Sequence, residues 1–362
     1  MKVLIIGYTH SKNDKRVFRT VQALSKRCRV IYQYLTEKKE HPIEEGNIEY
    51  LPVCYIREEN LLKKFFKRRN FDKMICKLVA EEDYDILYMH HFPATKPIEP
   101  FKIAKKRGKK IIYDVHEHHP QNFLGNLPVP LRWIKEQVMW WVFKRQIAFS
   151  DRCIFVSKEI ADDVFKTIGL EKPHLVVPNY ASVSMDPEKK EDEICFVGKT
   201  FRSLSTEEIQ ILKELAKDGI RFKVIGMNTN FGIENSKVLP FLPYEEMMKE
   251  VSKAKFSWIS FQTVVKSDRY KNDIFSLPHK FFDSIAAGTP VVVNKRFVSM
   301  AKIVEEKKVG IVIDPKNVKE SVEKIRKAFL NYGEIMESLK KHQRAFVWDE
   351  EKEERFLDFV LT

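Results

Sequence analysis

Segments with strand character alternate with segments of helical character along almost the whole chain. Strand-like runs rich in β-branched and aromatic residues span residues 2–7, 29–35, 85–91, 109–117 and 152–157. Amphipathic helical stretches lie between them, for example at residues 17–25 and 158–168. Strands that are separated by crossover helices pair in parallel, and the helices then cover both faces of the sheet. The pattern therefore predicts an α/β protein built on parallel sheets.

The same rhythm restarts in the second half of the chain. A length of 362 residues suits two domains of ordinary size. The restart at residues 193–198 follows a charged, turn-rich stretch at 185–193, in which we place the interdomain linker. Ser205 and Glu208 then form a capping-box pattern that starts a helix. We expect domains over 1–178 and 179–345, a final helix over 346–362, and two doubly wound parallel sheets that bind ligands beyond the carboxyl ends of their strands.

Charge and cysteine content narrow the choice of partners. Lys and Arg number 64 against 51 Asp and Glu, which gives a net charge of +13. This excess favours anionic partners such as nucleotide phosphates, acidic lipids or nucleic acid. The five cysteines have no metal-binding spacing, and no apolar run approaches the roughly 18 residues that a membrane span needs. We therefore expect a reduced, cytoplasmic protein.

Residues 276–293, SLPHKFFDSIAAGTPVVV, predict a loop, a helix and a buried strand in succession. Pro278 is favoured at a helix start, and Gly288 closes the helix before a β-branched run. Lys280 and Asp283 then lie in the first turns, where backbone N–H groups and the helix dipole favour a phosphate. Asp283 would accept hydrogen bonds from sugar hydroxyls. The alternative interpretation is an ordinary helix start whose Lys and Asp bind no ligand.

This segment resembles the Pro-Asn-Lys-Leu-Phe-Glu and Ala-x-Gly-x-Pro-Val-Val signature of family-4 glycosyltransferases, which have the GT-B fold. Shorter segments resemble further motifs of the family and follow in its order: YDVHE, FVSKEI, VVPN, FVG, VIG and PYEEM. The resemblance implies two Rossmann-like domains that face one cleft, with the final helix returning to the first domain. An oxidoreductase fits less well, because no GxGxxG follows Gly7.

The resemblance also implies a set of site residues. Gly7, Asp14, Arg16 and Glu117 would lie on the acceptor side. The nucleotide-sugar donor would be bound by Gly198, Lys199, Arg202, Gly226, Pro278, Lys280 and Asp283. Breaking a sugar–phosphate bond builds negative charge on the departing diphosphate, so Lys280 and Arg202 are the candidate catalytic cations. Lys199 is a weaker candidate than Arg202, and a solvated basic loop is the alternative for both.

His116 is the candidate catalytic residue of the first half, because it resembles the family histidine that reaches the donor sugar. Its position at the carboxyl end of a strand is where ligands bind in such sheets. His118, His119, Asp114 and Glu117 lie close to it in sequence and raise the alternative of a metal site. We expect no metal cofactor, since GT-B enzymes stabilise the diphosphate with side chains and helix dipoles. The nucleotide sugar is then a substrate.

One position departs from the family pattern. Many members have two Glu residues separated by seven others, and here Phe275 and Asp283 occupy those positions. Phe275 cannot accept a hydrogen bond. Either Asp268 or Asp273 substitutes for the missing Glu, or Lys280 and the backbone hold the diphosphate. An inactive scaffold is a further alternative.

Two segments, residues 60–78 and 131–149, combine Lys and Arg with Phe or Trp at helical spacing. Such helices can lie on an anionic membrane surface, or they can pack their apolar stripe on the sheet. For 131–149 the sequence favours packing. For 60–78 both interpretations stay open, with insertion through Phe65, Phe66 and Phe71 among Lys63, Lys64, Lys67, Arg68 and Arg69. We expect no nucleic-acid binding, because no motif for it accompanies the charge.

Together these features predict a glycosyltransferase that moves a sugar from a nucleotide sugar to a glycan or lipid-linked acceptor. The resemblance implies retention of anomeric configuration, and a role in the biosynthesis of surface polysaccharide or lipopolysaccharide at the inner face of a membrane. A nucleotide-sugar 2-epimerase and a non-catalytic scaffold are the alternatives.

Overall fold

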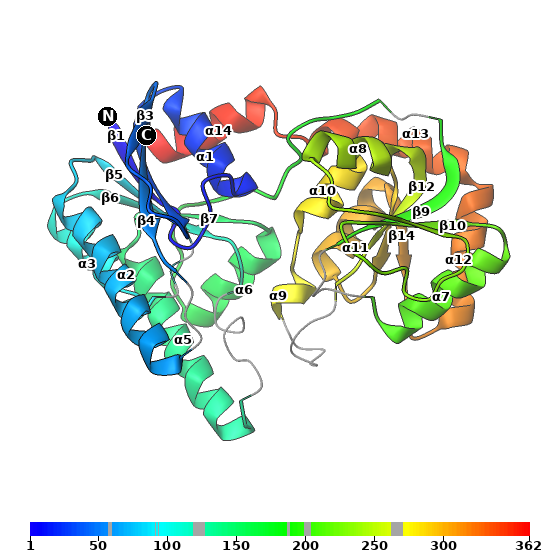
Figure 1. The fold of residues 1–362 in the computed structure, drawn as a ribbon, viewed down its shortest axis with the longest axis horizontal. Coiled ribbons are helices and arrows are strands. Elements are labelled where there is room, and N and C mark those ends of the chain that lie inside the picture. Colours follow the sequence, from blue (N-terminus) through cyan, green and yellow to red (C-terminus); the bar gives the residue numbers. More distant parts are fainter. Residues whose placement is uncertain are drawn as a thin grey trace. The chain divides into compact units, whose positions relative to one another are not determined.

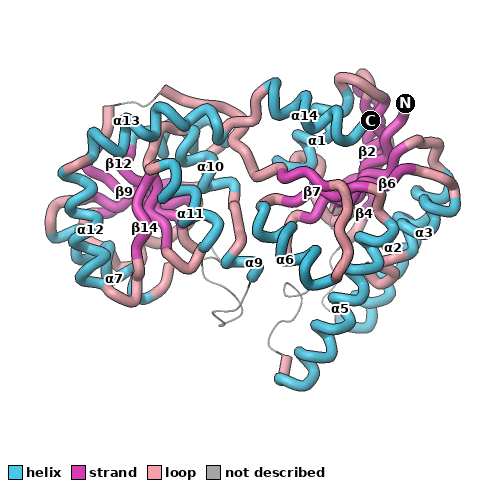
Figure 2. The backbone as a smooth tube through the Cα atoms, turned by 180° about the vertical axis from the view of Figure 1, so that it is seen from behind, coloured by secondary structure: helices cyan, strands magenta, loops and turns pink. Residues whose placement is uncertain are grey.

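The computed structural model describes residues 1–56, 60–90, 92, 94–118, 127–186, 189–198, 204–261 and 271–362. The chain forms two compact units, one made of Met1–Val177 with Glu350–Thr362 and the other of Pro178–Asp349. Each unit is a sheet with helices on both faces (Figures 1 and 2). All strands pair in parallel except the β3–β4 pair. The predicted α/β fold with two doubly wound sheets is confirmed.

The sheet of the first unit runs in the order β3-β4-β2-β1-β5-β6-β7-β8. Its strands are β1 (Lys2–Ile6), β2 (Arg29–Thr36), β3 (Ile43–Glu45), β4 (Ile48–Cys54), β5 (Ile86–His90), β6 (Lys110–Val115), β7 (Arg152–Phe155) and β8 (His174–Val176). The chain builds outward from β1 in one direction and from β5 in the other. The carboxyl ends of β1 and β5 therefore flank the point where the strand order reverses, which is where doubly wound sheets bind ligands.

Helices cover both faces of this sheet because its strands alternate buried side chains between the faces. The helices are α1 (Lys15–Ser25), α2 (Leu61–Glu81), α3 (Glu99–Lys106), α5 (Val129–Phe149), α6 (Lys158–Ile168) and α14 (Glu350–Leu361). Tyr113 on β6 packs against Phe101 of α3 and Phe143 of α5. The next residue, Asp114, points to the opposite face and pairs with Arg16 of α1.

The carboxyl-terminal helix α14 belongs to the first unit, where it packs beside α1 (Figure 1). Phe356, Leu357 and Val360 form its buried stripe. Arg27, two residues after the end of α1, pairs with Glu354 and Asp358 on the exposed side of α14. The helix is therefore held by apolar burial, with surface ion pairs at its margin.

The sheet of the second unit runs in the order β11-β10-β9-β12-β13-β14. Its strands are β9 (Glu191–Val197), β10 (Arg221–Ile225), β11 (Ser236–Leu239), β12 (Ala254–Ile259), β13 (Val291–Asn294) and β14 (Gly310–Ile313). Its helices are α7 (Thr206–Lys217), α8 (Tyr244–Lys253), α9 (Lys271–Ile274), α10 (His279–Ala286), α11 (Val298–Lys307), α12 (Val318–Leu330) and α13 (Tyr332–His342), followed by a 3₁₀ turn at Gln343–Phe346. The strand order reverses between β9 and β12.

The two faces of this second sheet have separate cores. Ile194 and Phe196 of β9 pack with α7 and α12, whereas Cys195 between them packs with α8. The predicted capping box is present, since Ser205 accepts from the Glu208 N–H and Glu208 accepts from the Ser205 N–H.

The charged sequence predicted the interdomain linker at residues 185–193, and this prediction is wrong. The units divide at Val177 and Pro178, and Glu191–Val197 forms β9. Glu193 is fully buried there, where the ammonium of Lys223 lies 2.5 Å away and the Arg221 guanidinium 3.0 Å away. The charge that suggested a loop is therefore neutralised inside the strand.

Replacing Phe356 by Ala should destabilise the first unit by about 3–5 kcal/mol, because the change empties a buried aromatic site between α14 and the sheet. Urea unfolding followed by circular dichroism measures the loss. Glu354→Ala is the matched control on the exposed side of the same helix, and it should change stability far less. Equal midpoints for Phe356→Ala and the unsubstituted protein would mean that α14 is not packed in solution.

Candidate functional sites at the carboxyl ends of the two sheets

The turn after β1 requires glycine at position 7. A Cβ added to Gly7 would lie 2.7 Å from the Gln33 carbonyl oxygen and 2.9 Å from the Tyr32 ring. The following residue, Tyr8, has a left-handed backbone with a φ of 56°, and its hydroxyl donates to Asp72 over 2.7 Å. The chain thus turns sharply at the reversal point and leads into the loop that carries His10 and Asp14.

Asp14 caps α1 by accepting from the backbone N–H groups of Arg16 and Val17. Its second oxygen lies 3.1 Å from Nδ1 of His10. Burial would raise the pKa of Asp14, but the hydrogen bond and charge of His10 and the Val17 N–H together lower that pKa well below its usual range. Asp14 is therefore an ionised cap that also holds His10 at the reversal point.

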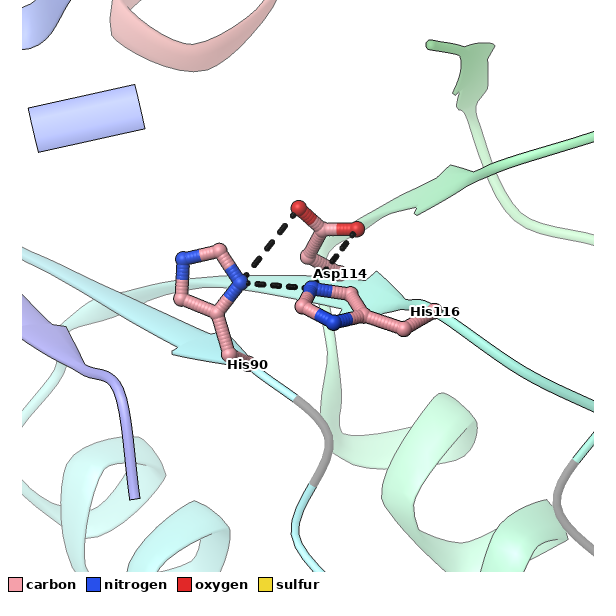
Figure 3. Close-up of side chains that lie close together, drawn as sticks. All are labelled: His90, Asp114 and His116. Atoms are coloured by element: carbon pink, nitrogen blue, oxygen red, sulfur yellow. Dashed lines mark hydrogen bonds and ion pairs between the residues drawn. The ribbon is translucent and has the colours of Figure 1, made fainter. Parts of the chain in front are cut away.

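A buried group of polar side chains lies at the ends of β5 and β6 (Figure 3). Nδ1 of His90 lies 2.7 Å from Nε2 of His116, and Asp114 approaches the two rings at 3.5 and 3.6 Å. Asp114 also accepts from Arg16 at 2.7 Å and from the Tyr88 hydroxyl at 2.8 Å. His90 and Asp114 are at most 1% exposed, whereas the His116 side chain is 11% exposed.

Burial and charge set the protonation of this group. Burial alone would raise the pKa of Asp114, yet Arg16 and the two histidines hold it well below its usual range. Burial lowers the pKa of His90 well below 6.5 and that of His116 in the same direction, with Asp114 opposing both shifts. These three pKa shifts favour an ionised Asp114 carboxylate paired with the Arg16 guanidinium, beside neutral imidazoles on His90 and His116.

Within the described part of the chain, His90, Asp114 and His116 also form the one group whose ligand atoms lie close enough together to hold a metal ion. Both oxygens of Asp114 already accept from Arg16 and Tyr88, and a guanidinium beside a cation site is repulsive. The two ring nitrogens are at hydrogen-bonding distance from each other. These contacts fit a hydrogen-bonded network better than a metal centre.

Among the residues that follow His116, His118 has its partner on a different element. β6 ends at Val115, so strand alternation does not extend to the histidines that follow. His118 is fully buried, and its Nε2 lies 2.8 Å from Asp163 of α6. Glu117 is partly buried. His119 lies outside the described residues.

Two glycines mark the corresponding edge of the second sheet. Gly198 follows β9, and an added Cβ there would meet the Phe196 ring at 2.8 Å and the Met227 sulfur at 2.9 Å. Gly226 follows β10 with a φ of 85°, and its added Cβ would lie 2.7 Å from the Gly198 carbonyl oxygen. Only glycine allows the two turns to approach so closely.

Lys280 lies in the first turn of α10 and reaches back over the reversal point of this sheet. Its ammonium donates to the Ser260 carbonyl after β12 and, over 3.4 Å, to the Val197 carbonyl that ends β9. It lies 4.8 Å from the centre of the Phe196 ring and 5.7 Å from that of Phe261. A positive charge is thus held at the ends of the two strands that flank the reversal.

Asp283 lies one turn further along α10, is 5% exposed, and accepts from the Tyr244 hydroxyl at 2.8 Å. Tyr244 in turn accepts from the Ser182 N–H, so Asp283 is connected to the start of α8. Pro278 is the residue before α10 and has an extended backbone. Phe275 is partly buried just after α9, and Asp273 lies within α9. Lys199, Arg202 and Asp268 lie outside the described residues.

His10 and His90 belong to this site although the sequence patterns did not indicate them. His90 ends the run DILYMHH, which reads as an apolar strand with two histidines at its end. Its position at the carboxyl end of a strand was the available signal, because side chains there face the ligand edge of a parallel sheet.

Comparison with protein families places the chain in a known class. The family model for glycosyltransferase family 4 matches residues 15–182, and that for glycosyl transferases group 1 matches residues 187–346. The chain belongs to these glycosyltransferases and is a transferase enzyme of the GT-B fold. This membership favours a transferase over the epimerase and scaffold alternatives. A search of curated protein sequences gave no match.

Solved structures show the same fold at low sequence identity. Sucrose-phosphate synthase from Thermosynechococcus elongatus matches with a TM-score of 0.69 and 11% identity, over 98% of this chain and 97% of that one. Trehalose-6-phosphate synthase from E. coli, bound with UDP-2-fluoro glucose, matches with a TM-score of 0.64 and 11% identity, over 100% of this chain and 99% of that one. The lipopolysaccharide outer core galactosyltransferase WaaB matches with a TM-score of 0.62 and 13% identity, over 99% of each chain.

Lowering the pH from 7.5 to 5.0 should destabilise the first unit, because His90 binds a proton near pH 6.5 only when unfolded. The unfolded chain then binds more protons, so the free energy of unfolding falls as the pH falls through this window. His90→Phe removes this imidazole, so the variant should lose less unfolding free energy between pH 7.5 and pH 5.0. Thermal unfolding at both pH values measures it, with the exposed His41→Phe as control. An unchanged pH dependence in His90→Phe would contradict a neutral, buried His90.

Proposed function

We propose that this enzyme transfers a sugar from a nucleotide-sugar donor, with retention of anomeric configuration, to a glycan or lipid-linked acceptor. The observation that carries the proposal is the position of the Lys280 ammonium between the ends of β9 and β12. Ligands of doubly wound sheets bind at this reversal point, and the adjacent glycine-only turns let a backbone approach a diphosphate closely. The UDP-2-fluoro glucose in the E. coli relative supports a nucleotide sugar as the donor class.

The charge that develops in the reaction explains why a cation is needed there. The departing diphosphate gains negative charge as the sugar leaves, and a preorganised ammonium stabilises that charge without reorganisation. Lys280 now contacts carbonyl oxygens, which a phosphate oxygen would replace. We also propose that Arg202 and Lys199 approach the diphosphate, that Asp283 binds ribose hydroxyls and that His116 contacts the transferred sugar. No metal cofactor enters this proposal, since the cation is supplied by the side chains.

Two parts of the proposal, retention of configuration and the class of acceptor, are supported by proteins of similar structure. One structural neighbour, trehalose-6-phosphate synthase, is described in connection with glycosyl transfer with retention. WaaB is a lipopolysaccharide galactosyltransferase, and a further neighbour, WaaG, is involved in lipopolysaccharide biosynthesis. We therefore propose a role in the assembly of surface polysaccharide or lipopolysaccharide, on the acceptor side formed by Gly7, Asp14, Arg16 and Glu117. The place of action would be the cytoplasmic face of a membrane.

Lys280→Ala should weaken binding of a nucleoside diphosphate by about ten- to one-hundredfold, the loss expected for one charged hydrogen bond. Isothermal titration calorimetry with UDP, GDP and ADP measures this and identifies the base. Asp283→Asn, which can still accept from Tyr244, should weaken binding by a smaller factor. Lys249→Ala, an exposed lysine on α8, is the matched control and should bind normally. Unchanged affinity in Lys280→Ala would remove this edge of the sheet from the donor site.

A membrane-bound acceptor requires the enzyme to reach the lipid surface, and two helices of the first unit suit this. No helix in the described part of the chain is long and apolar enough to cross a bilayer. The amino-terminal half of α2 exposes Leu62, Phe65 and Phe66 among basic residues. Phe71, expected to insert, is buried at 2% exposure, and Arg68 pairs with Asp72 and stacks on Tyr8.

The sequence predicted that residues 131–149 pack on the sheet, and this is wrong for the first part of α5. Only its last two turns are buried, through Val142, Phe143, Gln146 and Ile147. The preceding turns expose Val129, Leu131, Trp133, Ile134, Val138 and Trp141. The amino-terminal ends of α2 and α5 lie at the same end of the unit (Figure 1). We propose that both contact an anionic membrane, with lipid phosphates attracted by the basic residues and aromatic rings inserted shallowly.

Changing Lys63, Lys64, Lys67 and Arg69 to Gln should reduce binding to anionic vesicles strongly, since each basic residue near such a surface contributes about 1 kcal/mol. Co-sedimentation with vesicles of phosphatidylserine and phosphatidylcholine measures it at 0.1 M salt, where the Debye length is about 10 Å, and at 1 M, where it is about 3 Å. The matched control changes four exposed lysines of the second unit, Lys237, Lys249, Lys319 and Lys340, to Gln. Equal losses in both variants, or equal binding to pure phosphatidylcholine, would contradict the proposal.

A further inference from the structure

One polar atom of the group at β5 and β6 has no hydrogen-bond partner. Nε2 of His90 is buried and makes no hydrogen bond, while Nδ1 of the same ring lies 2.7 Å from Nε2 of His116. Figure 3 shows Nε2 of His116 directed at both His90 and Asp114. The two rings thus share a single hydrogen bond, and one of them must donate it.

We propose that His90 is a positioning residue that donates its Nδ1–H to Nε2 of His116 and thereby fixes His116 as the tautomer with its proton on Nδ1. The catalytic consequence of this tautomer rests on the glycosyl transfer proposed above. The tautomer itself can be measured without any substrate.

The direction of the hydrogen bond follows from the buried nitrogen of His90. If His116 donated, His90 would carry its own proton on Nε2, and a buried N–H would have no acceptor. Orphaned buried N–H groups are rarer in proteins than acceptors with an unused lone pair. If His90 donates from Nδ1, its Nε2 keeps only a lone pair. The second arrangement leaves no buried N–H of His90 without an acceptor.

The charges around the pair favour two neutral rings over a shared imidazolium. Arg16 donates to Asp114 at 2.7 Å, so the carboxylate already has a cation as its partner. A second positive charge on either ring would lie beside the guanidinium with little room for water. Burial lowers the pKa of both rings, which supports the same assignment. With one proton on each ring, the proton of His116 must be on Nδ1.

This assignment limits what His116 can do to a substrate. Its Nδ1–H is a hydrogen-bond donor on the ring of the group that keeps some exposure. It would donate to a hydroxyl or phosphate oxygen of the substrate, and it has no basic nitrogen on that side to remove a proton. His116 thus orients and polarises an oxygen, whereas a general-base role would need the opposite tautomer.

The direct test is the tautomer of His116 in the full-length protein labelled with ¹⁵N-histidine. Long-range ¹H–¹⁵N correlation spectra distinguish a protonated from an unprotonated ring nitrogen, and His116→Ala assigns the signals. We expect a protonated Nδ1 and an unprotonated Nε2 for His116. A protonated Nε2 on His116, or two protonated nitrogens at pH 7.5, would overturn the proposal.

Two substitutions of His90 separate positioning from packing. Asn places an amide N–H where Nδ1 of His90 lies, so His90→Asn should keep the His116 tautomer. His90→Phe keeps the ring volume but offers no donor, so the proton of His116 should move to Nε2, which faces Asp114 at 3.6 Å. His174→Phe, a histidine of β8 outside the group, should leave the His116 spectrum unchanged. An unchanged His116 tautomer in His90→Phe would contradict a positioning role.

Turnover with an identified donor and acceptor provides the second readout. His90→Phe should lower kcat by about 100-fold, the loss typical of one misdirected donor, and His90→Asn should recover most of it. Affinity for the bare nucleoside diphosphate should be unchanged in both. Equal kcat in His90→Phe and His90→Asn would overturn the catalytic part. If no nucleotide sugar serves as donor, the proposed function fails, while the NMR result still decides the tautomer.

Zinc provides a further control, because a metal bound by His90, Asp114 and His116 would need unprotonated nitrogens at both facing positions. Adding ZnCl₂ should leave the histidine spectrum of the protein unchanged. A stoichiometric shift of the His90 and His116 signals that EDTA reverses would identify a metal site and overturn the hydrogen-bond assignment.

Discussion

The buried ion pair between Arg16 and Asp114 is the interaction on which the first unit depends. The two charges are 2.7 Å apart, and their side chains are 4% and 1% exposed. Arg16 also donates to the Val177 carbonyl after β8, while Asp114 accepts from Tyr88 on β5. Removing either charge would leave the other buried and unpaired, at a cost of about 3–5 kcal/mol. The pair therefore joins the start of α1 to β5, β6 and the end of the last strand.

The same pair explains why the two reversal points differ chemically. In the first unit the carboxylate and guanidinium neutralise each other, so the adjacent histidines remain neutral and can offer only hydrogen bonds. In the second unit the Lys280 ammonium lies near the Phe196 ring and donates to the backbone carbonyl oxygens of Ser260 and Val197. In the transfer that we propose, negative charge would develop on the departing diphosphate, and this ammonium would stabilise it.

Local sequence signals predicted the parts of the fold that depend on local interactions. The helices α6 and α12 and the capping box at Ser205 follow from spacing and caps alone. Features that depend on distant partners were missed or misread. Glu193 suggested a linker because nothing in its own segment reveals Lys223. The importance of His90 arises only when β5 and β6 pair side by side, which places it against His116. The exposed turns of α5 have an apolar sequence that does not show where the sheet ends.

The departure at Phe275 is easier to understand from the contacts of α10. Asp283 is shorter than the Glu of the family pattern, and it is held by Tyr244, whose hydroxyl also accepts from the Ser182 N–H. A carboxylate restrained in this way is positioned by the protein before any ligand arrives, so little side-chain entropy remains to be lost on binding. Phe275 provides no carboxylate and therefore adds no repulsion toward phosphate oxygens. A diphosphate bound as we propose would then meet the Lys280 ammonium at the ends of β9 and β12, with no carboxylate at position 275.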